Sequence, residues 1–302
     1  MAPGLNGRRQ ITNNAMKIYL DYDQEGLDRQ YEHRHFVTNA DELLASQAAE
    51  SKRVREQANG RFDVAYGPGE DEILDIYLAE NNEGPAPIVV FFHGGRWAMG
   101  SKNSNCEAAE MYTNKGVHFV SVNFSLLPDV TMDVLIGQCR NAAAWVWRNA
   151  DTFGGDPARM FVHGKSSGAH VAGMMAVTDW TSYGELPADL FKGGLLVSGM
   201  YDLEPVRLTF RNAWLKMNEA AALANSPIRH IPANGCKLIV GVGALETDEF
   251  RRQSREFAEA WSGASLQCQF AEMPDRHHFS IHEDMNVATS QLTEPFLSWM
   301  AL

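Results

Sequence analysis

The sequence predicts a doubly wound α/β fold on a mostly parallel, eight-stranded sheet with helices on both faces. Between residues 87 and 270, short and nearly unbroken apolar runs alternate with helical stretches, which is typical of parallel strands that are covered on both sides. Two earlier segments alternate apolar and polar residues, which indicates an antiparallel pair. With 302 residues, 45% of them hydrophobic, the chain is long enough for one large core.

The first elements expected along the chain are a helix and that strand pair. Residues 40–57 are rich in Ala, Glu, Gln and Arg, which favours a helix. Residues 61–66 and 73–78 alternate apolar and polar positions on either side of a Gly- and Pro-containing turn at 67–71. We therefore expect two half-buried antiparallel strands at one edge of the sheet.

The parallel part of the sheet follows. Six runs rich in Val, Ile, Leu and Phe are the expected strands: 87–92, 118–124, 159–162, 194–197, 237–242 and 266–270. The expected helices are 105–115, 133–149, 169–177 and 248–261. In the second helix, Val134, Leu135 and Cys139 recur at helical spacing and predict an apolar face.

The predicted organisation is one domain with an extension. Residues 61–302 form the α/β domain, and residues 1–60 form a helical extension packed on it. The less regular segment 203–232 resembles an insertion above the sheet, where a lid would lie. The sequence is compatible with a homodimer but does not determine the oligomeric state.

The charge and apolar composition of the chain limit the classes of partner that it can bind. The net charge of −12 argues against nucleic acid and anionic membranes, which bind basic faces, and leaves a small molecule as the expected partner. No stretch approaches eighteen apolar residues, and the first thirty residues contain no apolar signal-peptide core. The four cysteines show no C-x-x-C spacing, so a cytoplasmic protein with reduced thiols is expected.

The pentapeptide Gly-Lys-Ser-Ser-Gly at 164–168 is the most informative motif. It lies between the apolar run 160–162 and the small residues of 169–176. A serine between two glycines at a strand-to-helix turn is typical of a nucleophile elbow, where Oγ projects above the sheet and the glycines allow close backbone contact. Ser166 is therefore the candidate nucleophile.

A nucleophilic serine needs a base and an acid that orients the base. In folds that carry this elbow, the chain order is serine, acid, histidine. His277 and His278 follow the last strand, as the order requires. Glu246 and Asp248 both follow strand 237–242. Glu246 is preferred because it is closer to the strand end, and Asp248 also fits the N-cap of the next helix.

Donors for an oxyanion are expected after strand 87–92, where Gly94 and Gly95 are adjacent. Two glycines in this loop allow backbone N–H groups to turn toward a substrate carbonyl, and the N–H of Ser167 behind the nucleophile completes the set. The alternative is that the glycines only form a tight loop.

The other candidates have structural interpretations. Asp202 is a reserve acid that fits a turn better, His163 and His170 are expected to be packed in the core, and His282 is expected at the surface or behind the site. No metal is expected, because the chain lacks H-E-x-x-H or a comparable ligand spacing. No cofactor is expected either.

Several longer motifs resemble one family. They comprise Leu-Asp-Arg-Gln-Tyr at 27–31, Tyr-Gly-Pro-Gly at 66–69, Leu-Asp-Ile-Tyr at 74–77, the stretches 91–97 and 100–102, the elbow with Ala-His at 169–170, the stretches 197–205 and 249–254, and His-Phe at 278–279. From about residue 27 onward the chain resembles an arylformamidase, or kynurenine formamidase, of the α/β-hydrolase fold.

The resemblance implies a serine hydrolase that cleaves a small N-formyl aryl amide such as N-formylkynurenine. It implies Ser166 as the nucleophile, His278 as the base and Glu246 at the position of the family's aspartate. Carboxylesterase or other amidase activity on an anionic substrate is the alternative, and a ligand-binding protein without catalysis is a third interpretation.

Three positions depart from the family pattern. Arg96 replaces an aromatic residue in the oxyanion loop, Lys165 replaces the histidine of the elbow, and Glu246 replaces aspartate. We expect Arg96 or Lys165 to pair with a substrate carboxylate. The alternative is that Lys165 packs against the helix and Arg96 pairs with a nearby acid. Trp97 is expected either to line the acyl side of the site or to support the loop.

Overall fold

The computed structural model describes residues 16–80 and 83–300, and the predicted fold class is confirmed. The strands are β1 Gly60–Ala65, β2 Ile73–Tyr77, β3 Ala86–Phe92, β4 His118–Val122, β5 Gly155–Lys165, β6 Gly193–Val197, β7 Lys237–Gly243 and β8 Cys268–Met273. They form one sheet in the order β1-β2-β4-β3-β5-β6-β7-β8. β2 is antiparallel to β1 and to β4, and the remaining neighbours are parallel.

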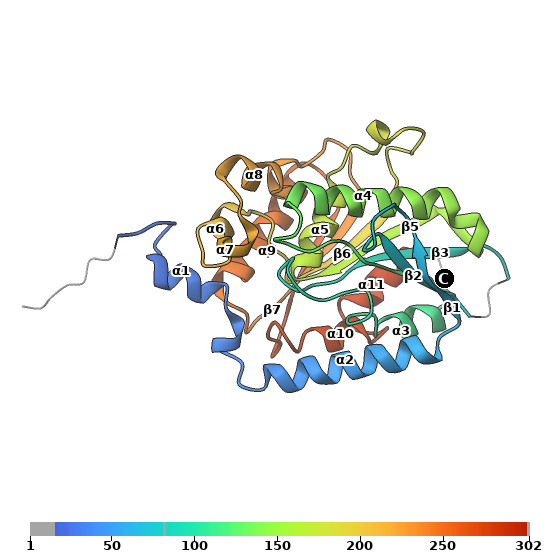
Figure 1. Cartoon of the computed structure of the whole chain (residues 1–302), viewed down its shortest axis with the longest axis horizontal. Coiled ribbons are helices and arrows are strands. Elements are labelled where there is room, and N and C mark those ends of the chain that lie inside the picture. The colour runs from blue at the N-terminus through green and yellow to red at the C-terminus, as the bar shows by residue number, and fades with distance from the viewer. Residues whose placement is uncertain (1–15, 81–82, 301–302) are drawn as a thin grey trace, which may run out of the picture.

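Helices cover both faces of this sheet (Figure 1). They are α1 Gln24–Gln30, α2 Ala40–Gln57, α3 Ala109–Asn114, α4 Met132–Asn149, α5 Ser167–Ala176, α6 Glu204–Arg207, α7 Asn212–Leu215, α8 Glu219–Ala224, α9 Asp248–Gly263, α10 His282–Met285 and α11 Thr293–Ser298. α4, α5 and α9 pack on one face, and α2, α3, α10 and α11 on the other. Each face has its own cluster of buried apolar side chains, so the sheet is the middle layer of three.

Two details of the predicted burial are wrong. β1 alternates in exposure as expected, but β2 is almost entirely buried because α2 covers the face that its polar residue Asp75 occupies. In α4, Leu135 and Cys139 are buried, whereas Val134 is 47% exposed. The buried face of α4 therefore includes Leu135 and Cys139 but not Val134.

Asp75 is the centre of a buried ionic cluster. Its carboxylate accepts hydrogen bonds from Arg55 Nε at 2.9 Å, Lys102 Nζ at 2.8 Å and the backbone N–H of Asp63 at 2.8 Å. Both Asp75 and Lys102 are at most 2% exposed. The cluster joins α2 to β2 and to the loop that follows Gly95, so it connects the N-terminal segment with the loop after β3.

Replacement of Asp75 by Asn is expected to lower the free energy of unfolding by about 3–5 kcal/mol, because it leaves the Lys102 ammonium buried without full compensation. Asp63, whose side chain is 60% exposed, contacts the same ammonium at 2.6 Å. Asp63→Asn is the matched control and should cost less than about 1 kcal/mol, as expected for a solvated partner. Urea unfolding measures both values, and equal costs would contradict this interpretation.

Two segments surround the carboxyl ends of the parallel strands. The described part of the N-terminal segment, with α1, η1 His33–His35 and α2, buries Leu27 and Tyr31 in the core. Segment 203–232 forms the short helices α6 to α8 beside α9 (Figure 1). Within residues 16–80 and 83–300, no helix has the length and apolar character needed to span a bilayer.

Candidate active site

The elbow has the predicted strand-turn-helix context. β5 ends at Lys165, Ser166 adopts φ 57° and ψ −125°, and α5 starts at Ser167. A Cβ on Gly168 would overlap the carbonyl oxygen of Phe92 on the neighbouring strand. Glycine is thus required there for α5 to pack against the sheet, and the turn presents Ser166 Oγ at the carboxyl edge.

The structure brings the three predicted triad residues together. Ser166 Oγ donates a hydrogen bond to His278 Nε2 at 3.0 Å, and His278 Nδ1 donates to Glu246 Oε2 at 2.7 Å. The second carboxylate oxygen of Glu246 accepts from Gly243 N at 2.9 Å and from Ser198 Oγ. The Glu246 carboxylate is fully buried, so its position and orientation are fixed by these partners.

The electrostatics keep the histidine neutral. Burial lowers the pKa of His278 well below its usual value, and the nearby cations Lys165, Arg211 and Arg96 lower it further. Burial raises the pKa of Glu246, while His33 and the hydrogen bonds from Ser198 and Gly243 oppose that rise. A neutral imidazole that is hydrogen-bonded to a serine hydroxyl can accept its proton.

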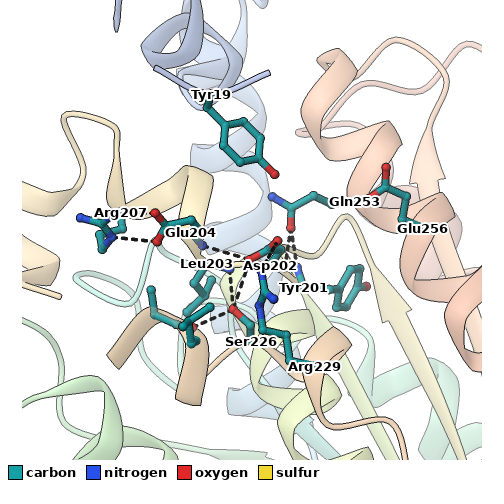
Figure 2. Close-up of polar contacts among 12 residues, drawn as sticks. Tyr19, Tyr201, Asp202, Leu203, Glu204, Arg207, Ser226, Arg229, Gln253 and Glu256 are labelled. Carbon is teal, nitrogen blue, oxygen red and sulfur yellow. Dashed lines mark hydrogen bonds and ion pairs between the residues drawn. The ribbon is translucent and has the colours of Figure 1, made fainter. Parts of the chain in front are cut away.

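The alternative acids lie elsewhere. Asp248 is the first residue of α9, its side chain is 77% exposed, and it lies 3.8 Å from Arg251. Asp202 has the turn role, because its Oδ1 accepts from the backbone N–H of Glu204 at 3.1 Å. Figure 2 shows Asp202 held together with Ser226 and Arg229, a cluster that does not include His278.

The other histidines are packed. His163 and His170 are fully buried, and each donates to a backbone carbonyl, that of Leu195 at 2.8 Å and that of Asn225 at 2.7 Å. His282 is 8% exposed, so a surface position is wrong, and its Nδ1 donates to the carbonyl of Phe279 behind the site.

The loop after β3 lies against the nucleophile. Gly95 has φ 126°, a conformation that favours glycine, and a Cβ there would overlap the carbonyl of Met99. Gly94 and Gly95 line the same cavity as Ser166. Ser167 Oγ accepts a hydrogen bond from the backbone N–H of Trp97 at 3.3 Å, which ties this loop to the start of α5.

Trp97 and Arg96 each have the second of their two expected contacts. Trp97 is 1% exposed, and its indole Nε1 donates to His170 Nδ1 at 3.1 Å, so it supports the loop and does not line the site. Arg96 lines the cavity, but both of its terminal nitrogens bind Glu32, at 3.1 Å each. The expected alternative of an Arg96 pair with a nearby acid is what the structure contains.

The cavity beside Ser166 has a volume of about 280 Å³. The N-terminal segment lines it through His33, Arg34, Leu44, Gln47 and Ala48. Segment 203–232 contributes Arg211. A larger groove of about 530 Å³ at the C-terminal end of α5 includes Cys236 and Lys237 at the start of β7, so it lies at the opposite edge of the sheet.

Sequence reasoning missed His33. Its ring stacks on His278 with centroids 4.1 Å apart and an angle of 12° between the planes, and its Nε2 lies 3.7 Å from Glu246 Oε2. Phe250 packs edge-on against both rings. His33 therefore restricts the rotation of His278. No local pattern marks it, because it lies in a 3-10 turn far from the elbow in sequence.

His33, Glu246 and His278 are also the group of side chains that comes nearest to a metal site in the described ranges. The 2.7 Å separation of His278 Nδ1 and Glu246 Oε2 is a hydrogen-bond distance. Two ligand atoms on one tetrahedral zinc lie roughly 3.4 Å apart, given bonds of about 2.1 Å. The arrangement fits a proton shared between imidazole and carboxylate better than a metal.

Comparison with known proteins identifies the relatives of this fold and site. A family model described as BD-FAE matches residues 74–191. The kynurenine formamidase of Danio rerio is 35% identical over 256 residues, which cover 82% of this chain and 85% of that protein. The kynurenine formamidase of Salmo salar is 33% identical, with coverage of 94% and 99%. The chain belongs to the kynurenine formamidase family.

Solved structures show the same fold. A putative thioesterase from Silicibacter sp. TM1040 superposes with a TM-score of 0.78 at 25% identity, over 91% of this chain and 99% of that one. An esterase from Pyrobaculum calidifontis superposes with a TM-score of 0.69 at 19% identity, over 87% and 92%. As a member of the kynurenine formamidase family, the protein is a hydrolase of the α/β fold that acts on small amides or esters.

Proposed function

We propose that the protein is a serine hydrolase that removes the formyl group from a small N-formyl aryl amide, as the name of its relatives suggests. The observation that carries the proposal is the continuous hydrogen-bonded chain from Ser166 through His278 to Glu246 beside a cavity. The cavity volume of about 280 Å³ is at the small end of ligand pockets and suits a single aromatic ring with a small acyl group.

The proposed mechanism is acyl transfer through the serine. His278 removes the hydroxyl proton of Ser166, and Oγ attacks the formyl carbon. The backbone N–H groups of Gly94, Gly95 and Ser167 stabilise the resulting oxyanion. The His278 imidazolium then protonates the leaving amine, and Glu246 stabilises that imidazolium.

Deacylation repeats these steps with water. His278, neutral again, removes a proton from a water molecule that attacks the formyl-serine ester, and formate leaves as Ser166 recovers its proton from His278. The lowered pKa of His278 favours the neutral form that both steps require at neutral pH. No external reductant, oxidant or metal enters this sequence.

Ester hydrolysis is the second candidate function. It is supported by a 28% identity to the esterase LipQ of Mycobacterium tuberculosis over 74% of this chain and 58% of that protein, and by structural neighbours named as esterases. The same nucleophile and oxyanion donors serve either reaction. The intact hydrogen-bonded chain argues against a non-catalytic binding protein.

A hydrolysis panel tests the proposal. N-formylkynurenine and N-formylanthranilate should release formate with a kcat/KM at least about tenfold above that for acetate release from the matching N-acetyl compounds, because the small cavity disfavours the extra methyl group. Formate and acetate are quantified enzymatically. Turnover of short p-nitrophenyl esters without turnover of any formamide would contradict the formamidase proposal and support the esterase.

A further inference from the structure

Four Arg and Lys side chains line the cavity beside Ser166, and they differ in their counter-charges. Arg34 pairs with Asp41 at 2.6 Å. Arg96 is paired with Glu32 through two hydrogen bonds of 3.1 Å. That geometry neutralises the guanidinium charge, so Arg96 needs no further counter-charge from a ligand. The other two cations, Lys165 and Arg211, have no such partner.

Arg211 is 4% exposed, yet none of its hydrogen-bond partners carries a charge. Nη2 donates to the backbone carbonyl of Tyr31, Nη1 contacts the sulfur of Met200 at 3.4 Å, and Nε has no partner. Burial, with Arg96 nearby, lowers the Arg211 pKa to about 9. A buried cation without a carboxylate is costly, so the fold retains this charge at the expense of stability.

Lys165 is the residue directly before the nucleophile and is half-buried. In the part of the chain that the structure describes, its Nζ forms no hydrogen bond and no ion pair. Glu107 and Glu246 attract it from a distance, but burial is the larger effect and lowers its pKa. Lys165 and Arg211 line the same cavity as Ser166 and His278, so both border the space that a substrate would occupy.

We propose that Lys165 and Arg211 form an anion-binding subsite that receives a carboxylate of the substrate. The inference rests on the proposed function, because it places the anion in the cavity where the scissile carbonyl would meet Ser166. It narrows the substrate class to aryl amides that carry a carboxylate on the amine side. The carboxylate supplies the counter-charge that the fold omits. In this proposal the guanidinium that binds it belongs to Arg211, and not to Arg96 as the sequence suggested.

The kinetic test compares two formamides that differ by one carboxylate, N-formylanthranilate and formanilide. We expect Lys165→Met and Arg211→Met each to lower the ratio of their kcat/KM values by roughly 10- to 100-fold, mainly through KM, because a charge-assisted hydrogen bond is lost. Lys165→Arg keeps the cation and should retain most of the ratio. Lys192→Met is the control, since Lys192 pairs with Asp189 at the distant groove and should leave the ratio unchanged.

Equal losses on both formamides would overturn the subsite. A binding test separates this result from a failure of the proposed function, because calorimetry of benzoate and benzamide needs no turnover. We expect the wild type to bind benzoate more tightly, and Lys165→Met to remove the difference. If no formamide is hydrolysed but benzoate is preferred, only the formamidase proposal fails; if the two bind equally, the subsite is wrong. If circular dichroism shows that Arg211→Met does not fold, the result for Lys165→Met alone decides whether the subsite exists.

Discussion

Replacement of Ser166 by Ala should lower kcat for formamide hydrolysis by roughly 10⁶-fold, the loss typical of removing the nucleophile from a serine triad. Without Oγ no acyl-enzyme forms, and His278 at 3.0 Å has no hydroxyl to activate. The residual rate would come from the oxyanion donors and substrate binding alone. Formate release under saturating substrate measures the change.

The matched control for this prediction is Ser182→Ala. Ser182 is exposed in the turn at 180–183 and donates only to the carbonyl of Asp179, so its removal should leave kcat within about twofold. A fluorophosphonate probe should label the wild type and Ser182→Ala but not Ser166→Ala. Labelling that persists in Ser166→Ala, or activity that survives there, would show that another residue is the nucleophile.

Much of the fold is encoded locally and was predictable. The parallel strands are continuous apolar runs because both faces of the sheet are covered, and the sequence shows this directly at 87–92 and 237–242. The elbow was predictable because its turn has no space for a side chain at the glycine positions. A Cβ on Gly168, for example, would overlap the carbonyl oxygen of Phe92. The chain order of serine, acid and histidine, with the position after strand 237–242, then gave Glu246 and Asp248 as the leading acids and Asp202 as the reserve.

The buried partners of the site were not predictable, because they come from contacts between distant segments. Ser198 donates to Glu246 from the end of β6, and His33 reaches the same carboxylate from the N-terminal segment. The sequence could not show whether Arg96 binds a substrate carboxylate or an acid of the protein. In the structure it pairs with Glu32, which lies 64 positions earlier. Pairing of charges across the fold is a tertiary property that no local pattern encodes.

The same reason explains the errors in burial. Asp75 in β2 reads as a solvent-facing residue because its neighbours alternate, yet Arg55 and Lys102 compensate its charge and α2 covers it. Trp97 follows the oxyanion glycines, so the sequence left open whether it lines the site or supports the loop. Its positive φ of 58° belongs to a turn that places the indole against His170, which is the supporting position.

Replacement of Glu246 by Gln should lower kcat by about 10⁴-fold, the loss seen when a triad carboxylate becomes an amide. The reason is the way in which the hydrogen bonds of the site orient the glutamine amide. Oε1 of Glu246 accepts from both Ser198 Oγ and Gly243 N, so the carbonyl oxygen of a glutamine must occupy that side. Its NH₂ group then takes the place of Oε2 and donates to His278 Nδ1.

That donation selects the wrong tautomer of His278. With Nδ1 as an acceptor, the ring proton resides on Nε2, which faces Ser166 and can no longer accept the hydroxyl proton. Glu246→Asp keeps the charge and should lose less activity than Glu246→Gln, although the shorter side chain lengthens the hydrogen bond. Asp248→Asn is the control for the rejected acid and should retain at least half of wild-type kcat. If Asp248→Asn lost as much activity as Glu246→Gln, the assignment of Glu246 as the orienting acid would be wrong. NMR of the imidazole nitrogens of His278 reports the tautomer directly.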